Sequence, residues 1–124
     1  MRKSLILICR NEEYRLKLLL PLMRPNFDEI IIINQESNDG TEEIALKYAD
    51  KVVNDIATGF ADSSLKLAHS LVTNEIIVRL DADEIITNRL LFDIDNYMMS
   101  DINGLLCSRA YIELFSPITL DLLT

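Results

Sequence analysis

Short apolar runs alternate along this chain with longer segments in which apolar residues recur every three or four positions. The run at residues 29–34 contains four consecutive isoleucines. Runs of this length and composition are typical of strands buried on both faces. We therefore expect strands at residues 4–9, 29–34, 51–54, 75–80 and 105–114.

The intervening segments have the spacing and the boundary residues of helices. We expect helices at residues 12–20, 41–49, 62–71 and 88–99. Asn11 is the expected N-cap of the first helix, whose first turn carries two carboxylates. Pro21 and Pro25 are expected to end that helix, because proline lacks the N–H that helical hydrogen bonding requires.

Regular alternation of strands and helices predicts a mostly parallel α/β sheet with right-handed crossovers and helices on both faces. At 124 residues, the chain is expected to form a single domain. No G-x-G-x-x-G segment follows the first strand, and no G-x-x-x-x-G-K-[ST] segment occurs anywhere. These absences argue against the usual dinucleotide-binding and P-loop folds.

The charge balance narrows the range of partners. The formal net charge is −8, and no basic patch of the kind that binds nucleic acid is visible. An acidic protein that binds a phosphorylated ligand needs a cation between the two negative partners. Cys9 and Cys107 have no metal-ligand spacing and are expected to be buried free thiols in a cytoplasmic protein. Peripheral membrane association is left open, and so is homo-oligomerisation through an exposed edge or apolar face of a truncated sheet.

The strongest candidate for chemistry is Asp81-Ala82-Asp83-Glu84, which directly follows the apolar run 76–80. Two carboxylates one residue apart after a strand can share a Mg²⁺ or Mn²⁺ ion, with substrate phosphates completing the shell. Asp93 and Asp95 repeat the Asp-x-Asp spacing, but they lie in an expected helix and are interpreted as a solvated face. Ligands of open α/β sheets bind beyond the carboxyl ends of strands, where Asp81 and Asp83 are expected.

Four segments together resemble glycosyltransferase family 2, which has the GT-A fold. They are Asn11-Glu12-Glu13 after the first strand, residues 38–45 after the second, Thr58-Gly59-Phe60 after the third and residues 80–84 after the fourth. The resemblance covers about residues 4–112. It implies a Rossmann-like GT-A sheet whose strand ends form a nucleotide-sugar site.

The resemblance also implies roles for particular residues. Asp83 would ligate Mn²⁺ or Mg²⁺, and the metal would hold the diphosphate of the donor, a UDP-sugar. Asp81 would contact the ribose or join the metal shell. Arg10, Asn11 and Glu12 would lie around the base and ribose. The remaining implied site residues are Asn34, Lys66 and Ala82. The reaction would be a metal-dependent, inverting transfer of the sugar to a hydroxyl of a saccharide or lipid-linked acceptor.

Relatives of this family continue beyond residue 124 with the part that supplies the acceptor site and the catalytic base. We therefore expect this chain to be the N-terminal, nucleotide-sugar-binding part, and we assign no base. Two kinds of role stay open for Glu84: a structural one, orienting the carboxylate loop or capping the following turn, and one in supporting the metal ligands. Asn11 is favoured as an N-cap over a ligand contact, and Asp39 as a helix cap or turn residue.

Two other functions remain open from the sequence. One is a non-catalytic nucleotide-binding or interaction module derived from the same fold. The other is a metal-dependent nucleic-acid enzyme of the topoisomerase-primase type, which also places Glu and Asp-x-Asp after strands. The acidic balance and the segment at residues 38–41 argue against the latter.

Overall fold

The structure is a computed structural model that describes residues 2–98. The first compact unit ends at Glu84, and the last helix belongs to a second unit that begins at Ile85. The strands are β1 (Lys3–Cys9), β2 (Glu29–Gln35), β3 (Lys51–Asp55) and β4 (Ile76–Leu80). The helices are α1 (Glu13–Met23), α2 (Thr41–Tyr48), α3 (Leu65–Leu71) and α4 (Asn88–Met98), with short 3₁₀ turns at η1 (Arg24–Asn26) and η2 (Ala61–Ser64). The expected strand at 105–114 lies outside the described residues.

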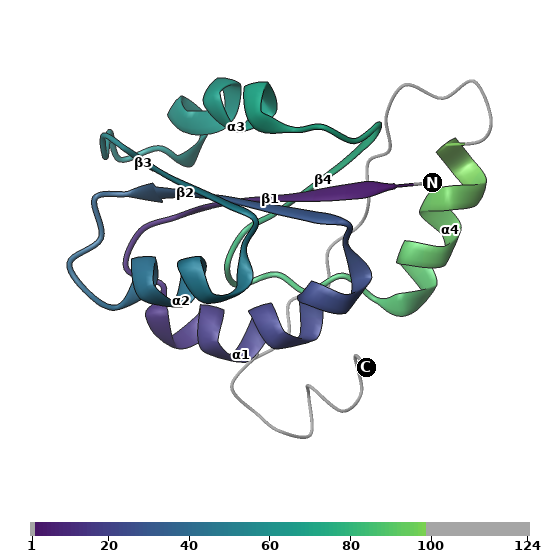
Figure 1. The fold of residues 1–124 in the computed structure, drawn as a ribbon, viewed down its shortest axis with the longest axis horizontal. Helices are drawn as coiled ribbons and strands as arrows, with labels where there is room; N and C mark the ends of the chain where they lie inside the picture. The colour runs from purple at the N-terminus through teal and green to yellow at the C-terminus, as the bar shows by residue number, and fades with distance from the viewer. Residues whose placement is uncertain (1, 99–124) are drawn as a thin grey trace. The chain divides into compact units, whose positions relative to one another are not determined.

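The four strands form one parallel sheet in the order β3-β2-β1-β4. The chain steps from β1 to β2 to β3 in one direction and then returns across the sheet to β4. Right-handed crossovers in opposite directions place their helices on opposite faces. Accordingly, α1 and α2 lie on one face and α3 on the other (Figure 1). The predicted α/β class, parallel sheet and two helical layers are confirmed.

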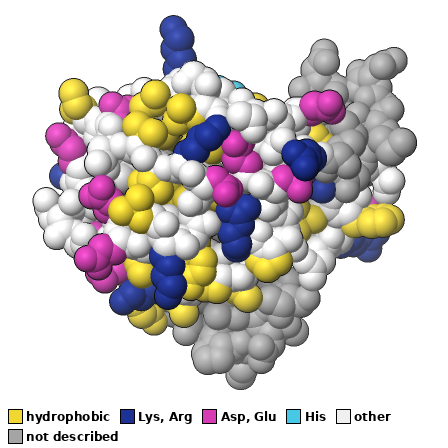
Figure 2. Space-filling view, in the orientation of Figure 1, with side chains coloured by type: hydrophobic (Ala, Val, Ile, Leu, Met, Phe, Trp, Pro, Cys, Tyr) yellow, Lys and Arg dark blue, Asp and Glu magenta, His cyan; other side chains and the backbone are white. Residues whose placement is uncertain are grey.

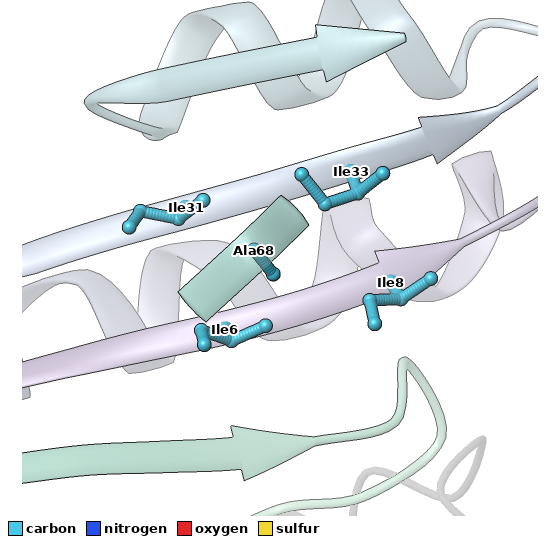
Figure 3. Packing of buried hydrophobic residues seen from close by; sticks show 5 residues of the cluster. All are labelled: Ile6, Ile8, Ile31, Ile33 and Ala68. Atoms are coloured by element: carbon cyan, nitrogen blue, oxygen red, sulfur yellow. The ribbon is translucent and has the colours of Figure 1, made fainter. Parts of the chain in front are cut away.

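Alternating side chains of the central strands fill the space beneath each helical layer. Ile6 and Ile8 of β1 and Ile31 and Ile33 of β2 gather around Ala68 of α3 (Figure 3). On the opposite face, α1 and α2 bury side chains of their own, among them Leu16, Leu20 and Ala45. Burial on both faces explains why β2 is apolar along most of its length rather than alternating.

The start and end of α1 differ from the sequence-based expectation. Asn11 has a φ of 52° and the N-cap is Glu12, so the prediction that Asn11 caps this helix is wrong. Pro21 lies inside the helix rather than at its end. Because Pro21 and Lys17 are both on the exposed face, water can solvate the Lys17 carbonyl that proline leaves without a helical partner. Pro25 falls in η1, directly after the helix.

The last described helix, α4, begins with a side-chain cap. The hydroxyl of Thr87 accepts a hydrogen bond from the N–H of Leu90 at 3.2 Å. Asp93 pairs with Arg89 one turn earlier, at 3.8 Å, and Asp95 lies in the same helix. The predicted position of this second Asp-x-Asp in a helix is confirmed, and Asp93 is partly exposed. None of the helices in residues 2–98 is long and apolar enough to cross a membrane.

A polar cluster lies at the amino ends of the strands. Glu29 accepts hydrogen bonds from the Ser4 hydroxyl at 2.9 Å and from the N–H and hydroxyl of Thr73 at 3.0 Å. Lys51 approaches the same carboxylate at 3.1 Å and donates to the Leu71 carbonyl. Burial of Glu29 disfavours the charged carboxylate and so raises its pKa. The hydrogen bonds favour the charged form more strongly and lower the pKa to about 2. The cluster joins β1, β2 and β3 to the chain that follows α3.

Candidate functional site

The exits of all four strands lie along one edge of the sheet. Cys9 pairs with Asn34, which pairs with Asn54, so β1, β2 and β3 end side by side. On the other side of β1, Leu80 pairs with Leu7, and Asp81 follows directly. Parallel strands place their carboxyl ends together, and this edge is where open α/β sheets bind ligands. The structure therefore brings the four sequence segments to one edge.

The carboxylate loop after β4 is a closed turn. Glu84 accepts a hydrogen bond from the Asp81 N–H at 2.8 Å, and its own N–H donates to the Asp81 carbonyl at 2.9 Å. Ala82 is buried, Asp81 is partly exposed and Asp83 is exposed. Of the two roles left open for Glu84, the structure shows the orienting one. The turn anchors itself through Ala82 and presents Asp83 to solvent.

The carboxylates of Asp81 and Asp83 make no hydrogen bond or ion pair with other residues in the 2–98 range. Within that range, no three His, Cys, Asp or Glu side chains gather closely enough to form a cage for a metal ion. The donor set is therefore two carboxylates. It fits Mg²⁺ or Mn²⁺ held by one or two carboxylates together with water and the phosphates of a substrate.

Hydrogen bonds join the loops that leave β1 and β2. The side-chain oxygen of Asn11 accepts from the Asn38 N–H at 2.7 Å, and the Asn11 N–H donates to the Ser37 hydroxyl at 2.9 Å. Asn11 and Glu36 both have a φ of 52°, the left-handed region that costs energy for residues other than glycine. Such positions gather at binding sites, where the surrounding structure holds them.

The N-termini of α1 and α2 are also joined, chiefly through Asp39. Its carboxylate accepts from the hydroxyl and the N–H of Thr41 and, at 3.3 Å, from the N–H of Glu13. Burial opposes the charge of Asp39, but these bonds lower its pKa. The turn role predicted for Asp39 agrees with this arrangement. Glu13 in turn accepts from the Gly40 N–H, and a Cβ at Gly40 would meet the Glu13 carboxylate, so a larger residue there would displace this side chain.

Asn34 reaches the expected edge, but its side chain is engaged with neighbouring residues. It is buried, its amide donates to Asn54 at 3.0 Å, and its oxygen accepts from the Ser37 hydroxyl. Asn34 therefore fixes the start of the loop after β2. Ser37 lies further along the loop after β2, close to the backbone N–H groups of Asn11 and Asn38. Sequence reasoning did not single out Ser37, although it lies within the turn segment at residues 37–40.

The charged residues named from the sequence lie on several elements. Arg10 directly follows β1 and is exposed. Glu12 is partly buried and makes two hydrogen bonds with Arg15, at 2.9 and 3.1 Å. Lys66 is the second residue of α3 and is exposed. Since α3 follows the exit of β3, the first turn of α3, which contains Lys66, lies near the same edge.

The loop after β3 is held against the end of β2 by Gln35, which the sequence analysis did not identify. The Gln35 amide donates to the Ser64 hydroxyl at 2.8 Å and to the Phe60 carbonyl at 3.2 Å. The Ser64 hydroxyl in turn donates to the Asp55 carboxylate at 2.8 Å. This hydrogen bond, together with a second one from the Ile56 N–H, lowers the pKa of Asp55. The sequence did contain a signal for this role of Gln35, because it is a polar residue at the end of the apolar strand β2.

Cys9 lies beneath this edge and is buried. Burial, together with the negative charges of Glu12 and Asp39, raises the pKa of the Cys9 thiol to about 12. The thiol faces the Ile33 carbonyl at 3.8 Å. Cys9 is thus an unreactive packing residue, as expected from the sequence, while Cys107 lies outside the described residues.

The charged side chains on the surface are mixed in sign. On the face drawn in Figure 2, lysines and arginines are interspersed with aspartates and glutamates and with small hydrophobic areas. That face therefore has no single dominant charge.

Comparisons with known proteins identify the fold and the family. The model of the family described as glycosyl transferase family 2 matches residues 4–115. An uncharacterized glycosyltransferase of Rickettsia conorii is 32% identical over 92 residues, covering 74% of this chain and 32% of the relative. The 4,4'-diaponeurosporenoate glycosyltransferase of Staphylococcus haemolyticus is 30% identical, covering 92% of this chain and 33% of the relative. The chain thus spans about a third of the length of these curated relatives.

Solved structures share the fold at low sequence identity. The crystal structure of residues 1–349 of S. aureus TarS has a TM-score of 0.68 at 20% identity, covering 88% of this chain and 39% of that 1–349 chain. Glucosyl-3-phosphoglycerate synthase from Mycobacterium tuberculosis, in complex with Mn²⁺, UDP and glucosyl-3-phosphoglycerate, has a TM-score of 0.59 at 22% identity, covering 81% and 40%. These neighbours have the GT-A fold, and the predicted fold class is confirmed. The family match over most of its length shows that this chain belongs to glycosyltransferase family 2.

Proposed function

We propose that this chain forms the donor-binding part of a glycosyltransferase that moves a sugar from a nucleotide diphosphate, a UDP-sugar, to a hydroxyl acceptor. The observation that carries the proposal is the turn at Asp81–Glu84. It holds two carboxylates, without partners in the described part of the chain, at the edge where four parallel strands end. Family membership supplies the reaction class.

Asp83 and Asp81 would hold Mn²⁺ or Mg²⁺ in this proposal. A bound metal ion would offset the charge of the diphosphate and stabilise it as a leaving group. The protein contributes a rigid turn: the bond between Asp81 and Glu84 fixes the loop, and buried Ala82 prevents it from turning over. The M. tuberculosis neighbour in complex with Mn²⁺ and UDP supports a divalent metal and a uridine donor here.

The nucleoside part of the donor would lie over the exits of β1 and β2. Arg10, Asn11 and Glu12 border this region on the β1 side, and Asn34 sets the course of the loop on the β2 side. Lys66 is a further candidate, because its ammonium group is exposed near this edge. Arg10 and Lys66 would add positive charge next to a diphosphate in an otherwise acidic protein.

An inverting transfer would proceed by one in-line displacement, with a carboxylate that takes the proton of the acceptor hydroxyl. We assign no such base to residues 2–98. The acceptor would be a saccharide or a lipid-linked molecule.

Calorimetric titration with UDP, with and without Mn²⁺, tests the donor site directly. We expect heat of binding with UDP that requires the metal, and weaker binding of GDP and ADP. Binding of UDP that is equal with and without Mn²⁺ would contradict the metal assignment. A folded protein that binds none of the three nucleotides would contradict the donor site, and would favour the non-catalytic interaction module.

A further inference from the structure

The loop after β3 carries an aromatic ring that faces solvent on a fixed backbone. The side chain of Phe60 is 74% exposed, one of the most exposed large apolar residues in the 2–98 range. Its carbonyl accepts hydrogen bonds from the Gln35 amide at 3.2 Å, the Ser63 hydroxyl at 2.8 Å and the Thr58 hydroxyl at 3.3 Å. The backbone that carries the exposed ring is therefore held in place by polar groups of its own loop and of β2.

The bond from Gln35 places this ring beside the exit of β2. Gln35 is the last residue of β2 and follows Asn34 directly. Its side chain reaches across to Phe60, so the loop after β3 folds back onto the end of the neighbouring strand. Gly59, with a φ of +87°, permits the turn that precedes the ring. Phe60 thus lies at the edge that carries Asp81 and Asp83, two strands away from them.

The spacing of the strands suits one part of the donor. From β4 to β2 there are two strand spacings, about 10 Å in all. This length is comparable with the separation between the diphosphate and the base of an extended nucleoside diphosphate. A diphosphate held at Asp81 and Asp83 would therefore bring its base to the exit of β2. A donor that pointed away from β1 would place its base beyond β4, which is the last strand of the described sheet. The base would then lie over no strand exit.

We propose that Phe60 is a stacking platform for the nucleobase of the donor, and that Gln35 positions it; this inference rests on the proposed donor site. Aromatic side chains stack on any base, because every base has a π-face. Phe60 would therefore add affinity without choosing between bases. Choice of base would fall to the polar groups of the loops after β1 and β2.

The experiment separates the base from the diphosphate. Calorimetry would measure the affinity for UDP and for inorganic pyrophosphate, each with Mn²⁺, in wild type and in Phe60→Ala, Phe60→Tyr and Phe92→Ala. Phe92 is the matched control, since it is 69% exposed but lies on α4. We expect Phe60→Ala to weaken UDP binding about tenfold and to leave pyrophosphate binding unchanged. Phe60→Tyr and Phe92→Ala should bind both ligands as wild type does.

Each other outcome overturns the inference in a recognisable way. Wild-type affinity for UDP in Phe60→Ala would show that the ring does not touch the base, and would leave the donor site standing. Equal loss of UDP and pyrophosphate affinity would show that Phe60 only supports the folding of the site. A wild-type protein that binds neither ligand would remove the donor site and the platform together.

Discussion

The side-chain oxygen of Asn11 accepts a hydrogen bond from the backbone N–H of Asn38 at 2.7 Å, and so joins the loops that follow β1 and β2. The two residues are 27 positions apart in the chain. Asn11 makes this bond from a left-handed backbone conformation, with a φ of 52°. The residue therefore acts as a bridge across the candidate site rather than as the start of a helix.

This bridge predicts a difference between two substitutions at one position. Asn11→Gly removes the hydrogen bond but suits the backbone, and should lower the free energy of unfolding by about 1 kcal/mol. Asn11→Ala removes the same bond and adds left-handed strain, for a total loss of about 2 kcal/mol. Urea unfolding measures both. An alanine variant as stable as the glycine variant would show that the positive φ carries no cost.

The carboxylate turn predicts that metal-dependent binding depends on one of the two Asp-x-Asp segments. Asp83→Ala should weaken Mn²⁺-dependent binding of UDP by at least about tenfold, because a charged metal ligand is lost. The fold should persist, since Asp83 is exposed and the turn is held by Asp81 and Glu84.

The matched control is Asp93→Ala in α4, a partly exposed helix position whose only described partner is Arg89. It should bind UDP as wild type does, and so should Asp95→Ala. Calorimetry measures the affinities, and circular dichroism checks the fold. Equal loss of affinity at positions 83 and 93 would refute the assignment of the site to the turn after β4.

The polar cluster around Glu29 predicts how stability changes with pH. The pKa of Glu29 falls from 4.5 to about 2 on folding, so the folded state favours the charged form. Its contribution is present above about pH 4.5 and is lost as the pH falls towards 2. Glu29→Gln should therefore lower the free energy of unfolding at pH 7 by about 2 kcal/mol, and by much less at pH 2.

Urea unfolding at several pH values provides this test. Glu75→Gln serves as the control, because Glu75 is exposed and lies near the same end of the sheet. A deficit in Glu29→Gln that stays constant between pH 7 and pH 2 would mean that packing, not charge, accounts for it.

The environment of Cys9 predicts slow reaction with thiol reagents. A pKa of about 12 leaves little thiolate at pH 8, and only the thiolate attacks. In a Cys107→Ser background, native protein should react with a disulfide reagent roughly a thousandfold more slowly than urea-unfolded protein. Absorbance of the released thiolate follows the reaction. Comparable native and unfolded rates would mean that Cys9 is open to solvent.

The sequence by itself determined the elements, the parallel sheet and the place of the carboxylate loop. These features follow from local patterns: apolar runs of strand length, helical spacing between them, and Asp81 and Asp83 directly after a strand. The register of a parallel sheet then brings the strand exits together without further information. The order of motifs at those exits was enough to indicate the family.

Only the tertiary structure decided how the exits are joined. The sequence predicted Asn11 as a helix cap. Its side-chain oxygen instead accepts a hydrogen bond from the Asn38 N–H, because the left-handed backbone turns it towards the neighbouring loop. Pro21 was predicted to end the helix, yet the helix continues to Met23; Pro21 and Lys17 both lie on its exposed face, where water can replace the lost hydrogen bond. The link from Gln35 to Phe60 joins residues 25 apart. Such contacts depend on which strands are neighbours and on which face a side chain points, and no local pattern of residues encodes either.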